Sequence, residues 1–283
     1  MSTQFSPVIA TKSHGKAGSF SVKSIDLDAI GKSASPIALL DDFRVSGRPF
    51  GPHPHAGFSQ LTYVFEDSMG SVRSRDSLGN DLVVGPGGIV WTQAGSGMMH
   101  QEVPADPKRE LHGLQVFVNL SAKNKLIEPK VLHLAGDKVP EWKNGTGDRV
   151  RVVVGTFARE ASPLSPAEPF ELLDVSLRRG IDFDLIDGYN ALVYVLDGEV
   201  TIGAEDCGQE VQTGHAIALS GSGGRVRIET AGTAHAVILS GPEISEPVVA
   251  HGPFIMNDQA QIEAALARYK AGAMGKLAPL ENI

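Results

Sequence analysis

The sequence consists largely of short strand-like segments, each ended by a turn rich in glycine or proline. The chain has 283 residues, of which 32 are glycine and 17 are proline. Residues 61–65 and 89–92 are rich in the β-branched and aromatic residues typical of strands. Between these runs, residues 85–88 read Gly-Pro-Gly-Gly, which predicts a tight turn. The pattern predicts an all-β chain with many turns.

Two pairs of segments indicate an internal repeat. Residues 61–65 match residues 192–196, which lie 131 positions later in the chain. Residues 87–91 resemble residues 214–219 at a similar offset. One pair of strand pentamers could recur by chance, but two pairs at similar offsets favour a duplicated domain.

The connection between the two copies is expected where strand character is lost. Residues 128–148 are rich in Pro, Lys, Gly and Asp. A length of roughly 100–200 residues per domain also allows two small domains in this chain. We therefore expect an N-terminal domain at 1–135 and a C-terminal domain at 136–283.

The C-terminal end has a different periodicity. Apolar side chains recur on one face of a helix, at Ile262, Ala265, Leu266 and Tyr269. Asp258 and Gln261 resemble a capping pair, and Gly272 is a plausible stop. We expect a helix over about 258–271 that packs on the flank of a domain. The alternative is a surface that binds a partner.

Composition excludes several classes of function. The 33 acidic residues outnumber the 25 basic ones and give a net charge of -8, which disfavours direct nucleic-acid binding. The single cysteine, Cys207, cannot form an intrachain disulfide, as expected in a reducing compartment. No secretory signal is recognisable in residues 1–20, and no apolar stretch approaches the roughly 18 residues of a spanning helix. We expect a soluble cytoplasmic protein that does not bind membranes.

Two pairs of candidate metal ligands share a two-residue spacing. His53 and His55 form one pair, and His100 and Glu102 form the other. In an extended strand, residues two apart point to the same face, so two such strands could direct three imidazoles and one carboxylate at one ion. These donors suit Fe(II), Mn, Co, Ni, Cu or Zn, and an octahedral ion would keep two positions open. The alternative for a His-x-His pair alone is two surface loop histidines.

The residues around these pairs resemble known motifs. Gly47, His53 and His55 give the spacing Gly-x5-His-x-His, which resembles the first cupin motif. Gly97 and His100 give Gly-x2-His, which resembles the core of the second. Longer stretches are similar to the pirin family, namely residues 52–58, 76–80, 92–102, 111–120 and 251–257.

The resemblance implies two tandem cupin (jelly-roll type) β-barrels with a short C-terminal helix. It also implies an iron ion, Fe(2+), in the N-terminal barrel, with the ligands His53, His55, His100 and Glu102. Other divalent transition metals stay open as alternatives. The second half lacks equivalents of these ligands, because Asp184, Ile186 and Ile228 fall at or near the corresponding positions. We expect no metal there.

Three positions depart from the family pattern. Members usually carry Arg where this chain has Ala56, and many carry Glu and His where it has Ser59 and Ser74. None of the three is a candidate ligand. They would line or support the site, so they bear on substrate choice and activity and not on metal binding.

The resemblance implies two kinds of function. For several pirin-like proteins it implies a quercetin 2,3-dioxygenase, which would take a flavonol-like small molecule and O2 as substrates. Glu102 is then the expected catalytic residue, because a carboxylate loosened from the metal could take the substrate hydroxyl proton. For other members it implies a non-enzymatic, iron-dependent regulator that binds a transcription factor or a metabolic enzyme. A third alternative is a relic whose metal is structural. We favour the enzyme, because a buried site with open coordination suits chemistry.

The other histidines have simpler interpretations. His112 could be a fifth ligand, but a structural hydrogen bond is the favoured interpretation. His215 and His235 lie in the half without the ligand pattern and are expected to have ordinary roles. His251 is expected to hold the C-terminal segment.

Overall fold

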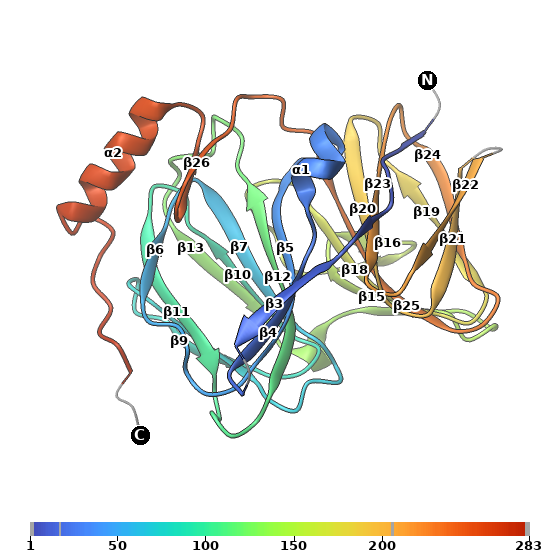
Figure 1. Ribbon diagram of the computed structural model, residues 1–283, viewed down its shortest axis with the longest axis horizontal. Helices are drawn as coiled ribbons and strands as arrows, with labels where there is room; N and C mark the ends of the chain where they lie inside the picture. The colour runs from blue at the N-terminus through green and yellow to red at the C-terminus, as the bar shows by residue number, and fades with distance from the viewer. Residues whose placement is uncertain (1–2, 17, 205–206, 281–283) are drawn as a thin grey trace.

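The chain folds into two β-barrels that stand side by side (Figure 1). The computed structural model describes residues 3–16, 18–204 and 207–280. Each barrel is built mainly from a large and a small antiparallel sheet, and one longer helix lies near the C-terminal end. The predicted all-β fold of two tandem cupin barrels with a short C-terminal helix is confirmed.

The first barrel uses the N-terminal half of the chain. Its larger sheet has seven strands in the order β13-β10-β7-β12-β5-β4-β3, and its smaller sheet has the order β6-β11-β8-β9. The strands are β3 Lys12–Lys16, β4 Phe20–Ser24, β5 Ile37–Val45, β6 His53–His55, β7 Phe58–Val64, β8 Val72–Asp76, β9 Asp81–Val84, β10 Ile89–Gln93, β11 Met98–Pro104, β12 Leu111–Asn119 and β13 Lys130–Leu134.

The second barrel follows the same plan. Its larger sheet has the order β1-β23-β20-β25-β18-β15-β14, with β2 also paired to β23, and its smaller sheet has the order β19-β24-β21-β22. Strands β1 and β2 come from the N-terminal end, so the chain starts on the second barrel and then builds the first. The strands are β1 Gln4–Phe5, β2 Ile9–Ala10, β14 Glu141–Lys143, β15 Arg149–Val154, β18 Glu171–Leu177, β19 Gly180–Leu185, β20 Tyr189–Asp197, β21 Glu199–Ala204, β22 Cys207–Gln212, β23 His215–Ser220, β24 Gly224–Glu229 and β25 Ala234–Pro242.

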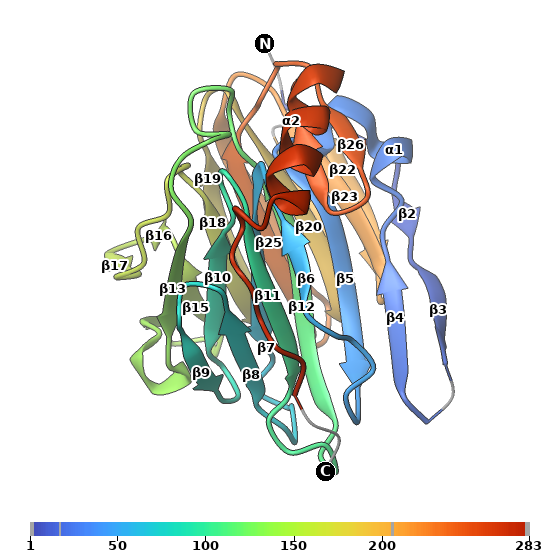
Figure 2. The ribbon, with the colours of Figure 1, turned by 90° about the vertical axis from the view of Figure 1, so that its left-hand side faces the viewer.

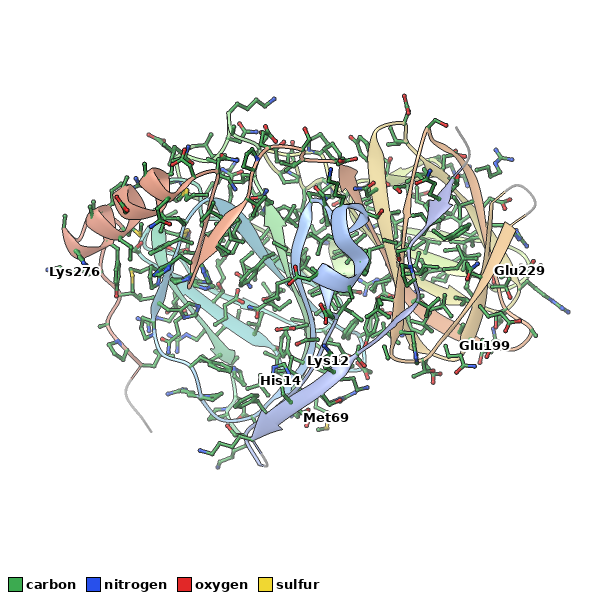
Figure 3. All side chains as sticks on the ribbon, turned by 45° about the horizontal axis from the view of Figure 1, so that its top comes forward. Lys12, His14, Met69, Glu199, Glu229 and Lys276 are labelled. Carbon is green, nitrogen blue, oxygen red and sulfur yellow. The ribbon has the colours of Figure 1, made fainter. Side chains whose placement is uncertain are left out.

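The two larger sheets pack against each other. All residues of β7 are buried, because one face of the strand packs against the second barrel and the other faces the interior of the first. Leu61 and Tyr63 pack in an apolar core that also contains Leu192 and Tyr194 of β20. The repeat in the sequence therefore corresponds to two strands that meet at the interface between the barrels. Side chains crowd both barrels (Figure 3).

The connections between strands are short. The helical ones are α1 (Leu27–Ile30) and the 3-10 turns η1 (Gly31–Ala34) and η2 (Gly136–Lys138). Two hairpins complete the fold, β16 (Thr156–Phe157) with β17 (Glu160–Ala161), and β26 (Val249–His251) with β27 (Phe254–Met256). The proposed domain boundary at residue 135 lies between β13 and β14.

The C-terminal segment returns from the second barrel to the first. We call residues 249–278 the C-terminal strap; it contains β26, β27 and the helix α2 (Gln259–Lys270). Figure 2 shows α2 and the chain after it lying across the face that contains β6 and β11. The predicted cap is present, because the Asp258 side chain accepts a hydrogen bond from the backbone N–H of Gln261. Within the described residues, no helix is both long and apolar enough to cross a bilayer.

Candidate metal centre

The four predicted ligands lie on two neighbouring strands. Strands β6 and β11 are antiparallel, with His53 opposite His100 and His55 opposite Met98. Because residues two apart in a strand share a face, His53 and His55 point to the same side as His100 and Glu102. The extended conformation assumed from the His-x-His and His-x-Glu spacing is confirmed for both strands.

Three of the four side chains form a tight cluster. One ring nitrogen from each of His53, His55 and His100 can be chosen so that all three lie within 4.8 Å of one another, a group that could hold a metal ion. The Nε2 atoms of His53 and His100 are 3.0 Å apart. The Nδ1 atom of His53 lies 2.9 Å from the carbonyl oxygen of Gly51, to which it can donate. That hydrogen bond leaves Nε2 of His53 as the donor atom for an ion.

Unpartnered buried atoms test whether a cation fits here. Both ring nitrogens of His55, Nδ1 of His100 and Oε1 of Glu102 are buried and have no hydrogen-bond partner among the described residues. Buried polar atoms are rarely left in this state, because the loss of water is costly. A metal ion would give a partner to one ring nitrogen of His55 and to the Glu102 carboxylate, so the residues fit one.

The electrostatics also suit metal binding. Burial, and after it the neighbouring His53, lower the pKa of His55 to about 3. Burial and the neighbouring imidazoles lower the pKa of His100 well below its usual range. Both rings are therefore neutral at physiological pH, which is the form that binds metals.

Glu102 lies outside the histidine group but lines the same pocket. Its Oε2 atom accepts hydrogen bonds from Oγ1 of Thr62 at 2.5 Å and from Nε2 of Gln60 at 2.9 Å. Burial raises the pKa of Glu102, and the hydrogen bonds from Thr62 and Gln60 lower it only in part. The carboxyl group is therefore held by one oxygen and keeps the other free.

The histidine cluster opens into a pocket of about 450 Å³ inside the first barrel. A volume of this size is typical of small-molecule sites. Aromatic side chains line much of it, namely Phe20, Phe43, Phe50 and Phe117. The ring of Phe117 also contacts that of His55, with centroids 5.4 Å apart. These aromatic residues were not predicted from the sequence. The period-two pattern of β5 and β12 is the signal that could have identified Phe43 and Phe117.

The C-terminal strap supports the strands of the candidate metal centre from outside. Backbone hydrogen bonds connect Ala56 to Pro253 and to Ile255, at 3.3 and 3.1 Å. On the other strand, the carbonyl oxygen of Met274 accepts hydrogen bonds from the backbone N–H of Met99 and the hydroxyl of Ser77. Strand β6 is thus held between β11 on one side and the strap on the other.

Gly57 marks the closest approach of the strap. Its φ is +84°, and a Cβ atom there would lie 1.9 Å from the carbonyl oxygen of Ile255. The Gly57 carbonyl also accepts a hydrogen bond from the buried Nζ atom of Lys125 at 2.9 Å. Only glycine allows both the backbone conformation and this contact.

The three positions that depart from the family pattern are all buried. Ala56 is fully buried under the strap, and Ser59 is 1% exposed. Ser74 lies opposite Glu102 on β8. The three residues surround or support the ligand strands.

Outside the cluster, His112 and His235 have structural partners. His112 lies between Asp67, 2.7 Å from Nδ1, and Asp42, 3.1 Å from Nε2. Both ring nitrogens are therefore engaged, and the interpretation of His112 as a structural residue is confirmed. Nε2 of His235 lies 2.6 Å from Oδ1 of Asp174 at the interface between the barrels.

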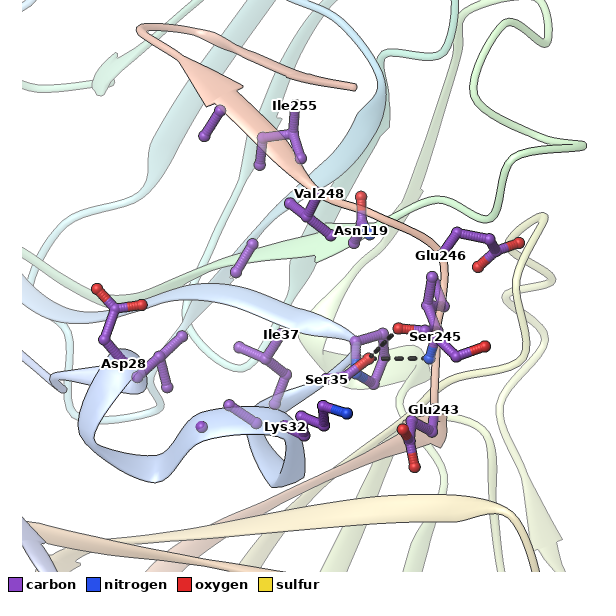
Figure 4. Close-up of a pocket in the computed structure, with 17 residues that line it drawn as sticks. Asp28, Lys32, Ser35, Ile37, Asn119, Glu243, Ser245, Glu246, Val248 and Ile255 are labelled. Carbon is purple, nitrogen blue, oxygen red and sulfur yellow. Dashed lines mark hydrogen bonds between the residues drawn. The ribbon is translucent and has the colours of Figure 1, made fainter. Parts of the chain in front are cut away.

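A second cavity of about 460 Å³ lies away from the histidines (Figure 4). It is bordered by α1 and η1 on one side and by residues 243–250 on the other. The Ser35 hydroxyl bridges the two sides, because it donates to the carbonyl oxygen of Ile244 and accepts from its N–H. The cavity thus lies where the chain leaves the second barrel for the strap.

Comparison with known proteins identifies the family. The pirin family model matches residues 7–118, and the model of the pirin C-terminal cupin domain matches residues 172–275. Human Pirin is 32% identical over 250 residues, which cover 86% of this chain and 84% of the human protein. The chain belongs to the pirin family.

Two other similar proteins carry enzyme names. A Pseudomonas aeruginosa protein named provisionally as a quercetin 2,3-dioxygenase is 33% identical over 251 residues, covering 84% of this chain and 86% of that protein. The crystal structure of a quercetin 2,3-dioxygenase from Acinetobacter baumannii superposes with a TM-score of 0.85 at 23% identity and covers 98% of this chain and all of that one.

A metal-containing pirin has the same fold. The crystal structure of the bacterial pirin YhhW from Escherichia coli in complex with nickel(II) has a TM-score of 0.65 at 20% identity. It covers 85% of this chain and all of that one. At 20% identity, this likeness shows that the two chains share a fold.

Proposed function

We propose that this pirin is an iron-dependent dioxygenase that opens a flavonol such as quercetin. The observation that carries the proposal is the pocket of about 450 Å³, which combines aromatic walls with three clustered histidines. A planar aromatic substrate could stack on the walls while its oxygen atoms reach the cluster. The proposed substrates are the flavonol and O2.

The proposed ligands of Fe(2+) are His53, His55, His100 and Glu102. Unpartnered buried atoms of His55, His100 and Glu102 support this set, and His53 belongs to it through the histidine cluster. When bound, the ion would supply Lewis-acid stabilisation of a substrate oxyanion and the redox chemistry that O2 requires. Nitrogen and carboxylate donors also suit other divalent transition metals, so the choice of iron belongs to the proposal.

Glu102 is the proposed general base. Thr62 and Gln60 hold its Oε2 atom, whereas Oε1 has no hydrogen-bond partner among the described residues. That oxygen can take the proton of a substrate hydroxyl if Glu102 moves away from the metal. Aromatic side chains line the same pocket, and electrostatic interactions are stronger in apolar surroundings than in water.

The test is anaerobic reconstitution with Fe(II), followed by measurement of O2 uptake and of quercetin absorbance. The His100→Ala variant is the control that lacks a proposed ligand. Turnover that is present in the wild type and lost in this variant would support the dioxygenase. Stoichiometric iron without turnover would overturn it and would favour the iron-dependent regulator, whose partner would then be sought by comparing protein binding to the Fe(II) and Fe(III) forms.

The role of Glu102 needs a separate variant. Glu102→Gln keeps the size of the side chain and removes its basicity. We expect iron to be retained and turnover to fall by about 10²–10⁴-fold, the usual contribution of a general base. Unchanged turnover would rule out the base role and leave the metal proposal intact.

A further inference from the structure

A row of polar side chains crosses the large sheet on the wall of the first-barrel pocket. Asp41 on β5 is opposite Gln115 on β12, and Gln115 is opposite Thr62 on β7. Residues directly opposite each other on antiparallel strands share a face, with Cβ atoms about 4.5–5.5 Å apart. All three line the pocket. We call Asp41, Gln115 and Thr62 the polar row.

The Thr62 end of the row belongs to the candidate metal centre. The Thr62 hydroxyl donates to Glu102 and accepts a hydrogen bond from Gln60 at 2.7 Å. Its hydrogen-bonding capacity is therefore used within the protein. The remaining members, Gln115 and Asp41, extend away from that centre.

The Asp41 end of the polar row has atoms that could hydrogen-bond to a ligand. Oδ1 of Asp41 accepts a hydrogen bond from the Ser24 hydroxyl at 2.5 Å, and Asp41 is only partly buried. Among the described residues, no hydrogen bond occupies Oδ2 of Asp41 or the amide of Gln115. Burial raises the pKa of Asp41, although the Ser24 hydrogen bond lowers it in part. A carboxylate in this position gains from a further hydrogen-bond donor.

The spacing and the surroundings define the shape of that ligand. Two strand spacings separate Asp41 from Thr62, which is about 10 Å. Phe43 and Phe117 flank the row, because each lies two residues from a row member on the same strand. The pocket therefore suits a long flat molecule that is aromatic along its length and carries hydroxyl groups at both ends.

We propose that Asp41 accepts a hydrogen bond from a phenolic hydroxyl on the substrate ring remote from the metal, with the Gln115 amide beside it. The site thereby selects flavonols that are hydroxylated on that ring. This inference rests on the proposed function, since it names the substrates that the same pocket prefers. In the competing interpretation, Asp41 only joins β4 to β5 through Ser24.

The test compares two flavonols that differ only at the remote ring. Quercetin carries two hydroxyl groups on that ring, and galangin carries none. Their dissociation constants are measured without O2, by quenching of protein fluorescence, for the metal-loaded wild type and Asp41→Asn. Asn has nearly the same size and can still accept from Ser24, so the fold is retained. Asp81→Asn, an exposed site on β9, is the control for loss of a charge.

The wild type is expected to bind quercetin at least about tenfold more tightly than galangin, as for a hydrogen bond to a charged group. In Asp41→Asn the ratio should fall to about one, through weaker quercetin binding, and Asp81→Asn should keep the wild-type ratio. A ratio that is the same in Asp41→Asn and wild type would overturn the inference.

The outcome also separates the two proposals. Binding of both flavonols with no preference in the wild type would overturn the role of Asp41 and leave the dioxygenase proposal in place. The expected preference without turnover in air would overturn the dioxygenase and leave the role of Asp41 intact. Failure of the wild type to bind either flavonol would overturn both.

Discussion

The hydroxyl of Tyr63, in the first barrel, donates a hydrogen bond of 2.5 Å to Oδ2 of Asp174, in the second barrel. The reverse also occurs, because the Tyr194 hydroxyl of the second barrel donates to Asp42 of the first at 2.9 Å. Tyr63 and Tyr194 occupy equivalent places in the repeat that the sequence indicates. The duplicated strand has thus kept a polar side chain that joins each barrel to the other.

These hydrogen bonds predict the cost of removing either hydroxyl. Tyr63→Phe and Tyr194→Phe should each lower the free energy of unfolding by about 1–3 kcal/mol, since a buried carboxylate loses a donor. Urea denaturation measures the change. Tyr189→Phe, at the half-buried start of β20, is the control and should change stability by less than about 0.5 kcal/mol. Equal effects of all three substitutions would argue against the special role of the interface pair.

The pair of His235 and Asp174 predicts a pH dependence of stability. Burial alone would lower the pKa of His235, but the hydrogen bond and charge of Asp174 raise it above its usual value. A raised folded-state pKa means that this stabilisation is fully present below about pH 6.5 and is lost as pH rises through the folded pKa. Burial alone would raise the pKa of Asp174, but its hydrogen bonds lower it below the usual value. Asp174 therefore stays ionised across this range.

The variant that checks this is His235→Gln, which can still donate to Asp174 but carries no charge. The difference in Tm between wild type and variant should be largest near about pH 5.5 and should shrink by about pH 9. His215→Gln, on the same barrel, is the control for the loss of an imidazole that does not contact Asp174. A constant difference for His235→Gln would contradict the prediction.

Metal removal should destabilise the protein. A ligand that binds only the folded state at about 100 times its Kd contributes about 2.7 kcal/mol, which raises the Tm of a chain this long by roughly 5 °C. Differential scanning fluorimetry of the metal-free protein, with and without added Fe(II) or Co(II), measures the shift. His100→Ala should show little or no shift. A rise of the same size in that variant would place the binding elsewhere.

The strap predicts an effect of Gly57 on metal affinity. Gly57→Ala would force the Ile255 carbonyl away from β6 and should weaken Co(II) binding by about 10–100-fold, the usual effect of disturbing the support of metal ligands. Gly79→Ala is the matched control, because Gly79 also has a positive φ of +96° but nothing within 4 Å of its added Cβ. Competition with a chromogenic chelator gives both affinities. Equal losses would show that backbone strain alone matters.

The sequence predicted the strands well where the residue types were distinctive. Residues 61–65 read as a strand, and β7 spans Phe58–Val64. The pattern could not tell which side of that strand faces which partner, because both sides are buried and no alternation of polar and apolar residues remains. The contact of Tyr63 with the second barrel therefore became visible only in the structure.

The residues of the candidate site also fall into those that the sequence could predict and those that it could not. The ligand candidates could be predicted because two-residue spacing in extended chain is a local property. The polar row could not, since the alignment of Asp41 with Gln115 depends on the register between strands far apart in the sequence. The C-terminal helix was predicted from its periodicity, but nothing in that pattern indicated that Met274, four residues beyond the helix end at Lys270, would contact the strand of His100.

The position of the strap along the chain also sets the order in which the metal centre can be assembled. Strand β6 is translated well before Phe254, which forms a β-bridge with Ala56 beside that strand. At about 5–20 residues per second, roughly 10–40 s of synthesis separate the two. During that time the outer edge of β6 has no partner within the nascent chain. Assembly of the candidate metal centre with its full support therefore has to wait until the strap has been synthesised.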